Sequence, residues 1–404
     1  MKYIAIIGFG VVGGGITSII ETNAEKIKKT VGDDVEVKYI LDLRDFPDSP
    51  YADRVVHEIT PILEDKDVSL VCETMGGSHP AYEFSVQCMK AGKSVVTSNK
   101  EVVANFGDKL LECAAENGVN YLFEASVGGG IPVIRPFTTS LAGEKIVRIS
   151  GIVNGTTNYI LTKMKDEGRE FGDVLAEAQQ LGFAERDPSA DIDGIDAQRK
   201  IIILNALATG VLLSADDVHA ETLRNVTPAD ISAAEKFGGS LKLIADTVIT
   251  ENSSETYVCP MIVPASCPLS FISDVYNGIS VTSAISGDIM YYGRGAGRLP
   301  TAGAVTADVV AVLSGAAKAE YIPVFKKTDA GYAKAFDEIK FTYYIRANSA
   351  TADIVEKLET MCDNVSVLDE NNGCVEIIAG EMTKHELDKA LSGVDIESVI
   401  RVRT

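Results

Sequence analysis

Basic residues and histidine are scarce in this 404-residue sequence. Lysine and arginine together number 37 against 58 aspartate and glutamate residues, which gives a formal net charge of −21. A field of that sign repels phosphate backbones and anionic lipids, so we expect no nucleic-acid and no membrane partner. It does not exclude a nucleotide cofactor, which local backbone amides can hold. With only four histidines, proton chemistry should fall to lysine or carboxylate.

The sequence also lacks the patterns of secreted and membrane-spanning proteins. Its seven cysteines form no CxxC pair and no metal spacing with histidine, which is typical of reduced thiols. No stretch approaches 18 uninterrupted apolar residues, and the amino-terminal MKYIAIIGFG is too short for the apolar core of a signal peptide. We therefore predict a cytoplasmic protein.

The first pattern that carries chemistry is a glycine turn. Gly8, Gly10 and Gly13 match GxGxxG directly after a predicted strand, Tyr3–Ile7, and at the opening of a helix. The first glycine permits a tight turn, the second lets a pyrophosphate approach the backbone, and the third allows close helix–strand packing. This context predicts a dinucleotide site; the alternative is a packing turn without a ligand.

The predicted second strand, residues 35–43, leaves the choice of nucleotide open. Asp42 at its end is placed to accept hydrogen bonds from a ribose 2′-hydroxyl, which favours NAD. Arg44 could instead meet the 2′-phosphate of NADP, and either residue could be a solvated loop charge.

Two further strands are predicted over residues 69–77 and 93–100, with a helix between them. Thr74 and Lys100 lie at the ends of these strands, where a parallel sheet presents its ligand edge. Lys100 is either a surface charge or, beside a nicotinamide, a donor to a substrate oxygen.

A predicted strand within residues 120–137 stops at three consecutive glycines. Exposed carbonyls there, with the carboxylate of Glu124, could ligate a hard cation through oxygen. The alternative is a loop without metal. In residues 151–164 we expect a strand, a polar turn and a helix. The threonine hydroxyls of the turn either cap this helix or bind a small polar substrate.

The stretch FAERDPSADIDGIDAQRK, residues 183–200, places five carboxylates ahead of an Arg-Lys pair and an apolar helix predicted from Ile195 to Ala208. Asp196 and Lys200 are four residues apart, as in a surface ion pair worth roughly 0.3–0.5 kcal/mol. That reading does not explain five acids before so apolar a helix. A buried Lys200 either needs acids to hold its charge or has a lowered pKa. Either case suits a donor to a developing alkoxide, with spare acids for a substrate ammonium.

These motifs, in this order, resemble homoserine dehydrogenase from residue 1 to about 315. The matching segments are GFGVVGGG, SNKEVVA, EASVGGGIPVIRPF, GIVNGTTNYIL, FAERDPSADIDGIDAQRK and YYGRGAGRLPTAGAVTADVV. The resemblance implies NAD(P)H-dependent reduction of L-aspartate 4-semialdehyde to L-homoserine, on the route to threonine, methionine and isoleucine.

The resemblance also implies residue roles. Lys200 is the proton donor, Glu185 binds the substrate with help from Asp191 and Asp196, and Lys100 borders nicotinamide and substrate. The implied nucleotide contacts are Gly8, Phe9, Gly10, Val11, Val12, Gly13, Thr74, Lys100 and Gly297. The implied site for a monovalent cation, sodium or potassium, is Glu124 with the backbone of Val127, Gly129 and Ile131.

The sequence departs from the family pattern at two positions. Leu41 stands at the end of the second strand, where many relatives carry arginine. The choice between NAD and NADP as the cofactor therefore stays open. Arg298 follows GRGAG where a small residue is more usual, close to the expected cofactor cleft.

From about residue 338 the order of predicted elements becomes βαββαβ. This order resembles the ACT domain, which senses small molecules, and implies an amino-acid effector such as threonine and a homodimer or homotetramer. The usual first-loop Pro-Gly is replaced by Asn348-Ser349-Ala350-Thr351, so simple dimer stabilisation is the alternative.

The sequence thus predicts an α/β enzyme in three parts, since its length exceeds that of a single core. A Rossmann-type nucleotide-binding domain covers residues 1–135, with 300–325 returning to it. An α+β substrate and dimerisation domain covers 136–300, and an ACT-like domain 338–404. The rival functions are a dehydrogenase for another small amino or hydroxy acid, and a catalytically silent sensor of nucleotide and amino acid.

Overall fold

The computed structural model describes residues 1–317, 323–328, 331–348, 351–371 and 374–404. It divides the chain into two compact units. The first unit comprises Met1–Ile146, Ile202–Ser214 and Ser283–Thr328. The second unit comprises Val147–Ile201, Ala215–Thr282 and Asp329–Thr404. The predicted division into three domains stays a prediction.

The first unit contains a parallel sheet with strand order β3-β2-β1-β4-β5-β6. Its strands are β1 (Lys2–Ile7), β2 (Val35–Leu41), β3 (Val55–Val56), β4 (Val68–Glu73), β5 (Ser94–Thr97) and β6 (Tyr121–Leu122). The chain moves outward from β1 to β3 and then returns to β4 on the other side of β1. Ligands of doubly wound sheets bind at such a switch point, outside the carboxyl ends of the strands. The predicted Rossmann-type α/β fold is confirmed.

Helices of this unit cover the sheet and bury its apolar residues. They are α1 (Val11–Thr22), α2 (Ala24–Val31), α3 (Thr60–Glu64), α4 (Ala81–Lys90), α5 (Lys100–Glu116), α6 (Ile134–Thr138) and α12 (Arg298–Leu313). Three further strands complete it: β8 (Val211–Leu212), β13 (Gly287–Arg294) and β14 (Lys326–Lys327).

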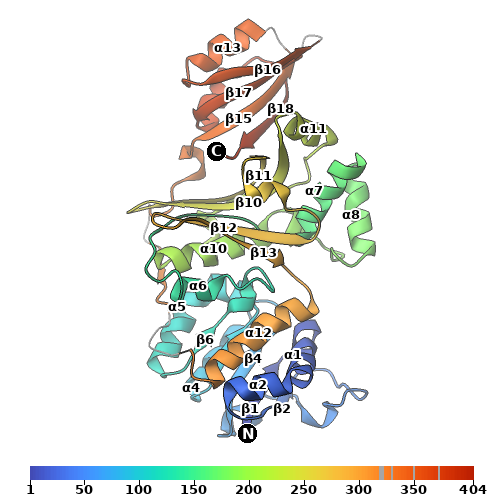
Figure 1. Ribbon diagram of the computed structural model, residues 1–404, viewed down its shortest axis with the longest axis vertical. Helices are drawn as coiled ribbons and strands as arrows, with labels where there is room; N and C mark the ends of the chain where they lie inside the picture. The colour runs from blue at the N-terminus through green and yellow to red at the C-terminus, as the bar shows by residue number, and fades with distance from the viewer. Residues whose placement is uncertain (318–322, 329–330, 349–350, 372–373) are drawn as a thin grey trace. The chain divides into compact units, whose positions relative to one another are not determined.

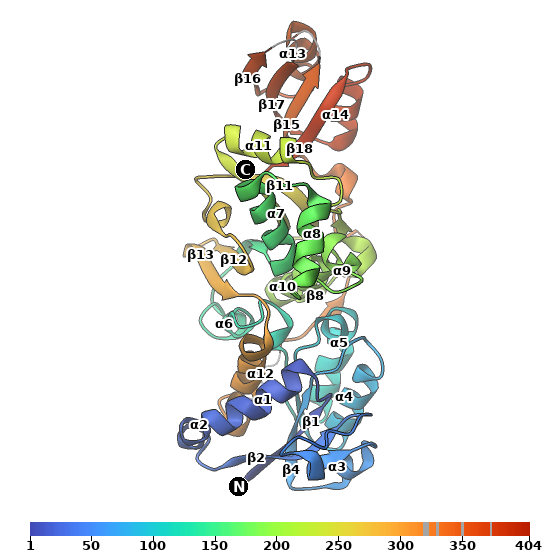
Figure 2. The ribbon, with the colours of Figure 1, turned by 90° about the vertical axis from the view of Figure 1, so that its right-hand side faces the viewer.

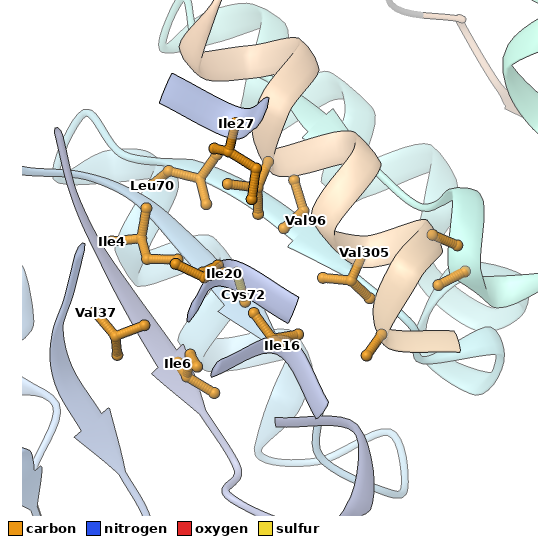
Figure 3. Close-up of a cluster of buried hydrophobic side chains, with 14 of the residues drawn as sticks. Ile4, Ile6, Ile16, Ile20, Ile27, Val37, Leu70, Cys72, Val96 and Val305 are labelled. Carbon is orange, nitrogen blue, oxygen red and sulfur yellow. The ribbon is translucent and has the colours of Figure 1, made fainter. Parts of the chain in front are cut away.

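The core of the first unit joins segments far apart in the sequence (Figure 3). Ile4 and Ile6 of β1 pack with Ile16 and Ile20 of α1 and with Val305 of α12. Each fully buried side chain of this size contributes about 1.5–3 kcal/mol of transfer free energy. Helix α12 therefore lies against α1, as both views show (Figures 1 and 2).

The second unit is built on a mainly antiparallel sheet with the order β12-β7-β10-β11-β18-β15-β17-β16, and β9 also pairs with β11. The strands before the C-terminal segment are β7 (Ile146–Ile152), β9 (His219–Ala220), β10 (Gly239–Ile249), β11 (Ser254–Pro264) and β12 (Tyr276–Ser283). The helices are α7 (Gly155–Glu167), α8 (Phe171–Gln180), α9 (Ser189–Ile192), α10 (Ile195–Thr209) and α11 (Pro228–Lys236). Helices α7 and α8 pack side by side (Figure 2). The division between the units falls inside α10.

The C-terminal segment has the predicted βαββαβ order. Its elements are β15 (Phe341–Asn348), α13 (Thr351–Glu359), β16 (Val365–Asn371), β17 (Cys374–Met382), α14 (Lys384–Ala390) and β18 (Ile396–Val402). Strand β18 runs parallel to β11, so the last strand of the chain extends the sheet of the second unit. Two residues of the unusual first loop, Ser349 and Ala350, lie outside the described residues.

Within the described ranges, no helix is long and apolar enough to span a bilayer. Each of the seven cysteines carries a free thiol.

Some predicted boundaries were wrong. Residues 120–137 form the short β6, a 3-10 turn over Glu124–Ser126 and the start of α6, not a strand that continues to the glycines. Lys100 is the first residue of α5 rather than the end of β5, which stops at Thr97. The Asn99 side chain starts this helix by accepting the N–H of Val102 at 3.2 Å.

Glu73, the last residue of β4, is a buried carboxyl at the ligand edge of the parallel sheet. It accepts the Thr97 hydroxyl at 2.6 Å and the N–H of Met75 at 2.7 Å, but it is only 1% exposed. Burial raises its pKa from 4.5 to about 7, because desolvation outweighs these two hydrogen bonds.

The raised pKa predicts a pH-dependent stability. Between pH 4.5 and about 7 the folded chain retains a proton on Glu73 that the unfolded chain has lost. The free energy of unfolding therefore falls as pH rises through this window, by roughly 3 kcal/mol from this group. Glu73→Gln removes that loss, so the variant gains stability relative to wild type between pH 5 and pH 8. Urea midpoints at several pH values measure the gain; Glu116→Gln, an exposed carboxyl of α5, is the matched control. Parallel wild-type and Glu73→Gln pH profiles would contradict the assignment.

Candidate functional site

The glycine turn after β1 has the geometry of a nucleotide cradle. Gly8 adopts φ +89°, which L side chains rarely allow. A Cβ atom on Gly13 would stand 2.3 Å from the carbonyl oxygen of Gly8, whereas one on Gly10 would meet nothing within 4 Å. The turn is therefore closed on its inner side and open at Gly10, where α1 begins. These residues fit a pyrophosphate held at the helix N-terminus.

Two predicted contact residues adjoin this turn. Thr74, directly after β4, donates its hydroxyl to the carbonyl oxygen of Gly8 at 2.6 Å and so supports the turn. Gly297 immediately precedes α12. The atypical Arg298 donates to the carbonyl oxygen of Gly14 and to Ser18 Oγ, both at 3.0 Å, and thereby ties α12 to α1. Two more of the predicted contacts lie on α1: Val11 is 68% exposed at its start, and Val12 packs partly against the core.

Asp42 follows β2 and faces the turn. Its Oδ2 accepts the N–H of Phe9 at 2.8 Å, and Arg44 donates Nε to Oδ1 and Nη2 to Oδ2, both at 3.0 Å. The Arg44 guanidinium is the main reason that the pKa of Asp42 is lowered to about 2. The Asp42 side chain is 9% exposed and that of Arg44 is 64% exposed. An ionised carboxylate thus stands after β2, beside the glycine turn, and it holds the nearby arginine.

Glu124 is 4% exposed in a loop that leads to the three glycines. Its carboxylate accepts the N–H of Ile134 at 2.8 Å and of Arg135 at 2.7 Å, at the start of α6. The side chain therefore closes the loop over residues 124–135 internally. The groups of this loop that suit a hard cation are mainly backbone carbonyl oxygens, as at Val127, Gly129 and Ile131.

Asp308 of α12 reinforces this loop. Its Oδ2 accepts the N–H of Glu124 at 2.9 Å, and its Oδ1 accepts the Arg135 guanidinium. Burial and the neighbouring Glu124 raise the pKa of Asp308 to about 7. The loop also contacts the GRGAG segment, because the N–H of Gly130 donates to the carbonyl oxygen of Arg294 at 3.1 Å. Elsewhere too, the described residues place no three His, Cys, Asp or Glu side chains together to hold a metal ion.

In the second unit, α10 carries Lys200 into the interior. Residues 201–204 are fully buried or nearly so, which confirms the predicted helix and its burial. Lys200 Nζ donates to Asp196 Oδ2 and to the carbonyl oxygen of Val153, both at 2.6 Å. The two side chains are 10% and 6% exposed, so this is a buried pair and not the alternative surface pair. A carboxylate so close favours the charged form of the lysine.

Asn154 joins this pair to a second carboxylate, and the sequence prediction missed it. Its Nδ2 donates to Asp196 Oδ2 at 2.8 Å and to Asp191 Oδ1 at 2.7 Å. Its Oδ1 accepts the N–H of Thr157 at 2.9 Å and so caps α7. The predicted threonine caps were wrong: Thr156 instead donates to the carbonyl oxygen of Phe183 at 2.7 Å. An asparagine at the strand–helix junction was the available signal, since Asn is a preferred N-cap.

The structure separates the five carboxylates of residues 183–200. Asp191 and Asp196 meet through Asn154, whereas Asp193 pairs with Arg224 at 2.9 Å. Asp187 accepts the Ser189 hydroxyl at 2.7 Å within its own turn. The side chain of Glu185 is exposed, on the loop between α8 and α9. Three of the five therefore lie at or near the surface, and two form a polar centre with Lys200.

This centre has the groups required to deliver a proton to a developing oxyanion. A charged lysine in a site with little water stabilises and protonates an alkoxide far better than in bulk solvent. The carboxylates of Asp191 and Asp196 add two groups of the chemistry that accepts hydrogen bonds from a cation.

Two family models match the chain. One, described as homoserine dehydrogenase, matches residues 132–310; the other, its NAD-binding domain, matches residues 8–124. Among curated proteins, the homoserine dehydrogenase of Synechocystis is 41% identical over 319 residues, which cover 77% of this chain and 73% of that protein. The homoserine dehydrogenase of Lactococcus lactis is 37% identical over 362 residues, 88% of this chain and 81% of that protein.

Solved structures give the same comparison. The homoserine dehydrogenase of Thiobacillus denitrificans is 30% identical with a TM-score of 0.88, covering 100% of this chain and 98% of that one. A hyperthermophilic archaeal homoserine dehydrogenase mutant in complex with NADPH is 30% identical with a TM-score of 0.66, covering 77% of this chain and 98% of that one.

The Asp42–Arg44 pair predicts how the nucleotide preference will shift. Asp42→Asn keeps an acceptor for the N–H of Phe9, removes a charge that repels a 2′-phosphate, and frees Arg44. We expect the ratio of NADPH to NADH affinity to rise at least tenfold, about 1.4 kcal/mol, in fluorescence titrations. Asp42→Asn combined with Arg44→Ala should return most of the shift. An unchanged ratio in the single variant would remove Asp42 from the ribose site.

Proposed function

Because this chain belongs to the homoserine dehydrogenase family of NAD(P)-dependent oxidoreductases, we propose that Lys200 is the proton donor in its reaction. The reaction reduces L-aspartate 4-semialdehyde to L-homoserine. The observation that carries the assignment is the buried ammonium of Lys200, held by Asp196 and by the carbonyl oxygen of Val153.

When bound, NAD(P)H supplies the hydride that adds to the aldehyde carbon. The carbonyl π bond then breaks toward oxygen, and the oxygen takes a proton from Lys200 Nζ as the new C–O–H group forms. Lys200 is left neutral and regains a proton from solvent before the next turnover. Asp196 favours the charged lysine and thereby restores the donor.

The remaining polar groups serve the amino-acid end of the substrate. Asp191 and Asp196 are proposed to receive its ammonium group, with Glu185 closing on it from the loop after α8. Asn154 supports this role because its side-chain Nδ2 donates to both aspartates and so holds the two carboxylates close together. Lys100 at the start of α5 is proposed to border the nicotinamide and the substrate.

The nucleotide contacts are proposed as the residues of the glycine turn, Thr74 and Gly297. The open face at Gly10 and the support from Thr74 favour this assignment. Asp42 beside Phe9 favours NADH over NADPH as the preferred reductant.

We also propose a monovalent cation, sodium or potassium, on the carbonyl oxygens of residues 124, 127, 129 and 131. The internal bonds of the Glu124 carboxylate support a rigid loop around such a site. A homodimer or homotetramer and an amino-acid effector such as threonine on the C-terminal segment remain proposals that rest on the family resemblance.

Replacing Lys200 tests the proton donor. Lys200→Arg keeps a positive charge beside Asp196, but arginine does not release its proton in proteins. We expect kcat to fall by about 10²–10⁴-fold while nucleotide affinity stays within about twofold. Lys163→Ala, which removes a half-buried lysine of α7 that pairs with Glu167, should leave kcat unchanged. Near-normal turnover in Lys200→Arg would assign the proton to another group. Lys200→Met with Asp196→Asn avoids an unpaired buried charge and should be equally slow.

Replacing the salt tests the cation. At constant ionic strength, tetramethylammonium chloride is too large for a carbonyl cage and should lower the initial rate several-fold. Added potassium or sodium should restore the rate with a saturating dependence. Equal rates in all three salts would overturn the cation proposal and leave the Lys200 assignment untouched.

A further inference from the structure

A short segment of the second unit, residues 219–224, contacts both the last strand of the chain and the turn between α9 and α10. We call it the connecting segment. Its first two residues are β9, which pairs in parallel with Tyr257 and Val258 of β11. The N–H of Glu221 continues this pairing by donating to the carbonyl oxygen of Val258 at 2.9 Å. One side of the connecting segment is thereby fixed to the sheet of the second unit.

Arg401 of β18 holds the connecting segment from the C-terminal part of the chain. Its Nη1 donates to Glu221 Oε2 at 2.7 Å, and its guanidinium lies 4.9 Å from the centre of the Phe336 ring and 5.0 Å from that of Phe341. Burial disfavours the ionised form of Glu221, but His219 and Arg401 hold the pKa of its carboxyl below the usual value. Two aromatic rings and an ionised carboxylate thus keep the guanidinium in one place.

The backbone of the connecting segment lies against the α9–α10 turn, residues 192–194. The N–H of Leu223, a fully buried residue, donates to the carbonyl oxygen of Ile192 at 3.0 Å. At the other end of the turn Gly194 has φ +76°, and a Cβ atom there would stand 3.2 Å from the carbonyl oxygen of Glu221. The turn therefore contacts the same residue that pairs with Arg401.

Asp193, in the middle of the α9–α10 turn, is bonded to the connecting segment through its side chain. Its Oδ1 accepts the Thr222 hydroxyl at 2.8 Å and Arg224 Nε at 2.9 Å. Asp191 on α9 precedes the turn, and Asp196 on α10 follows it. The turn therefore sets the separation of two carboxylates that belong to different helices.

We propose that Arg401 and Glu221 are positioning residues of the substrate site. They hold the connecting segment, the segment holds the α9–α10 turn, and the turn sets the distance between Asp191 and Asp196. This inference rests on the proposed function, in which those two aspartates receive the substrate ammonium group.

The positioning role acts on substrate binding and not on proton transfer. Lys200 and Asp196 lie on one helix, so their bond at 2.6 Å is kept when the α9–α10 turn shifts. Asp191 then moves relative to both residues, and the substrate ammonium group loses part of its binding. Such a loss raises the KM for L-aspartate 4-semialdehyde and leaves kcat nearly unchanged.

Initial rates of the full-length protein measure this effect. Arg401→Met and Glu221→Gln should each raise the KM for the semialdehyde about fivefold, with kcat and the KM for NADH within about twofold of wild type. The double variant removes both charges of the pair together, so it should raise the KM no more than either single change. Arg346→Met is the matched control, because it breaks the 2.8 Å pair with Glu397 on the same sheet but outside the connecting segment. Its KM should equal that of wild type.

Thr222→Val tests the middle of the route without removing a charge. It deletes the bond to Asp193 Oδ1 and should raise the same KM, which keeps the test available if the Arg401 variant does not fold. Circular dichroism verifies the fold of each variant. An unchanged KM in the folded variants, additive effects in the double variant, or an equal rise in Arg346→Met would each overturn the positioning role.

Asp191→Asn separates this inference from the proposed function. It removes the carboxylate itself and should raise the KM for the semialdehyde at least tenfold, about the loss of one hydrogen bond to a charged group. A raised KM in this variant, with unchanged values in the Arg401 and Glu221 variants, would overturn the positioning role alone. An unchanged KM in Asp191→Asn would overturn the substrate role of Asp191, and the positioning role with it.

Discussion

The polar centre at the end of β7 is organised around one buried charge, the ammonium group of Lys200. Burying a lysine to 8% exposure is costly unless opposite charge or hydrogen-bond acceptors surround its ammonium group. Asp196 supplies the charge from one turn earlier on α10, and Val153 supplies a carbonyl oxygen from the end of β7. Asn154 then links the acid to Asp191 and caps α7. The end of one strand and the positions of three helices are thereby fixed by the requirement to satisfy a single cation.

The first unit depends on a different constraint, which is the close approach of backbone to backbone. The turn after β1 exists because Gly13 brings no Cβ against Gly8, and the same closeness leaves amides of α1 facing outward. Helix α12 reaches this turn from late in the sequence, and Asp308 on it bonds the loop that begins at Glu124. Helix α12, which follows the GRGAG segment, thus contacts both the glycine turn region and the candidate cation loop.

Local patterns in the sequence predicted the elements that carry these features, because strands, glycine turns and the apolar α10 each leave a signature within about ten residues. The partners of the polar side chains were not predictable in this way. The sequence does not show that the Glu124 carboxylate accepts hydrogen bonds from backbone amides. Nor does it show that Asp193 pairs with Arg224 rather than with Lys200, or that Asn154 bonds two aspartates. These outcomes depend on residues 10 to 42 positions apart, and tertiary packing decides them. Lys100 was misplaced for a local reason, since Asn99 starts a helix one residue before it.

The C-terminal segment shows how far such a tertiary choice can extend. Its four strands pair with one another in the order β18-β15-β17-β16, and β18 also pairs with β11. Two arginines reinforce that connection: Arg401 pairs with Glu221 at 2.7 Å, and Arg403 donates to Ser150 Oγ at 3.1 Å. Ser150 lies on β7, three residues before Val153, whose carbonyl oxygen accepts a hydrogen bond from Lys200 Nζ. Movement of β18 away from β11 must break these bonds, so order in the last strand and order at the end of β7 are mechanically linked within the second unit.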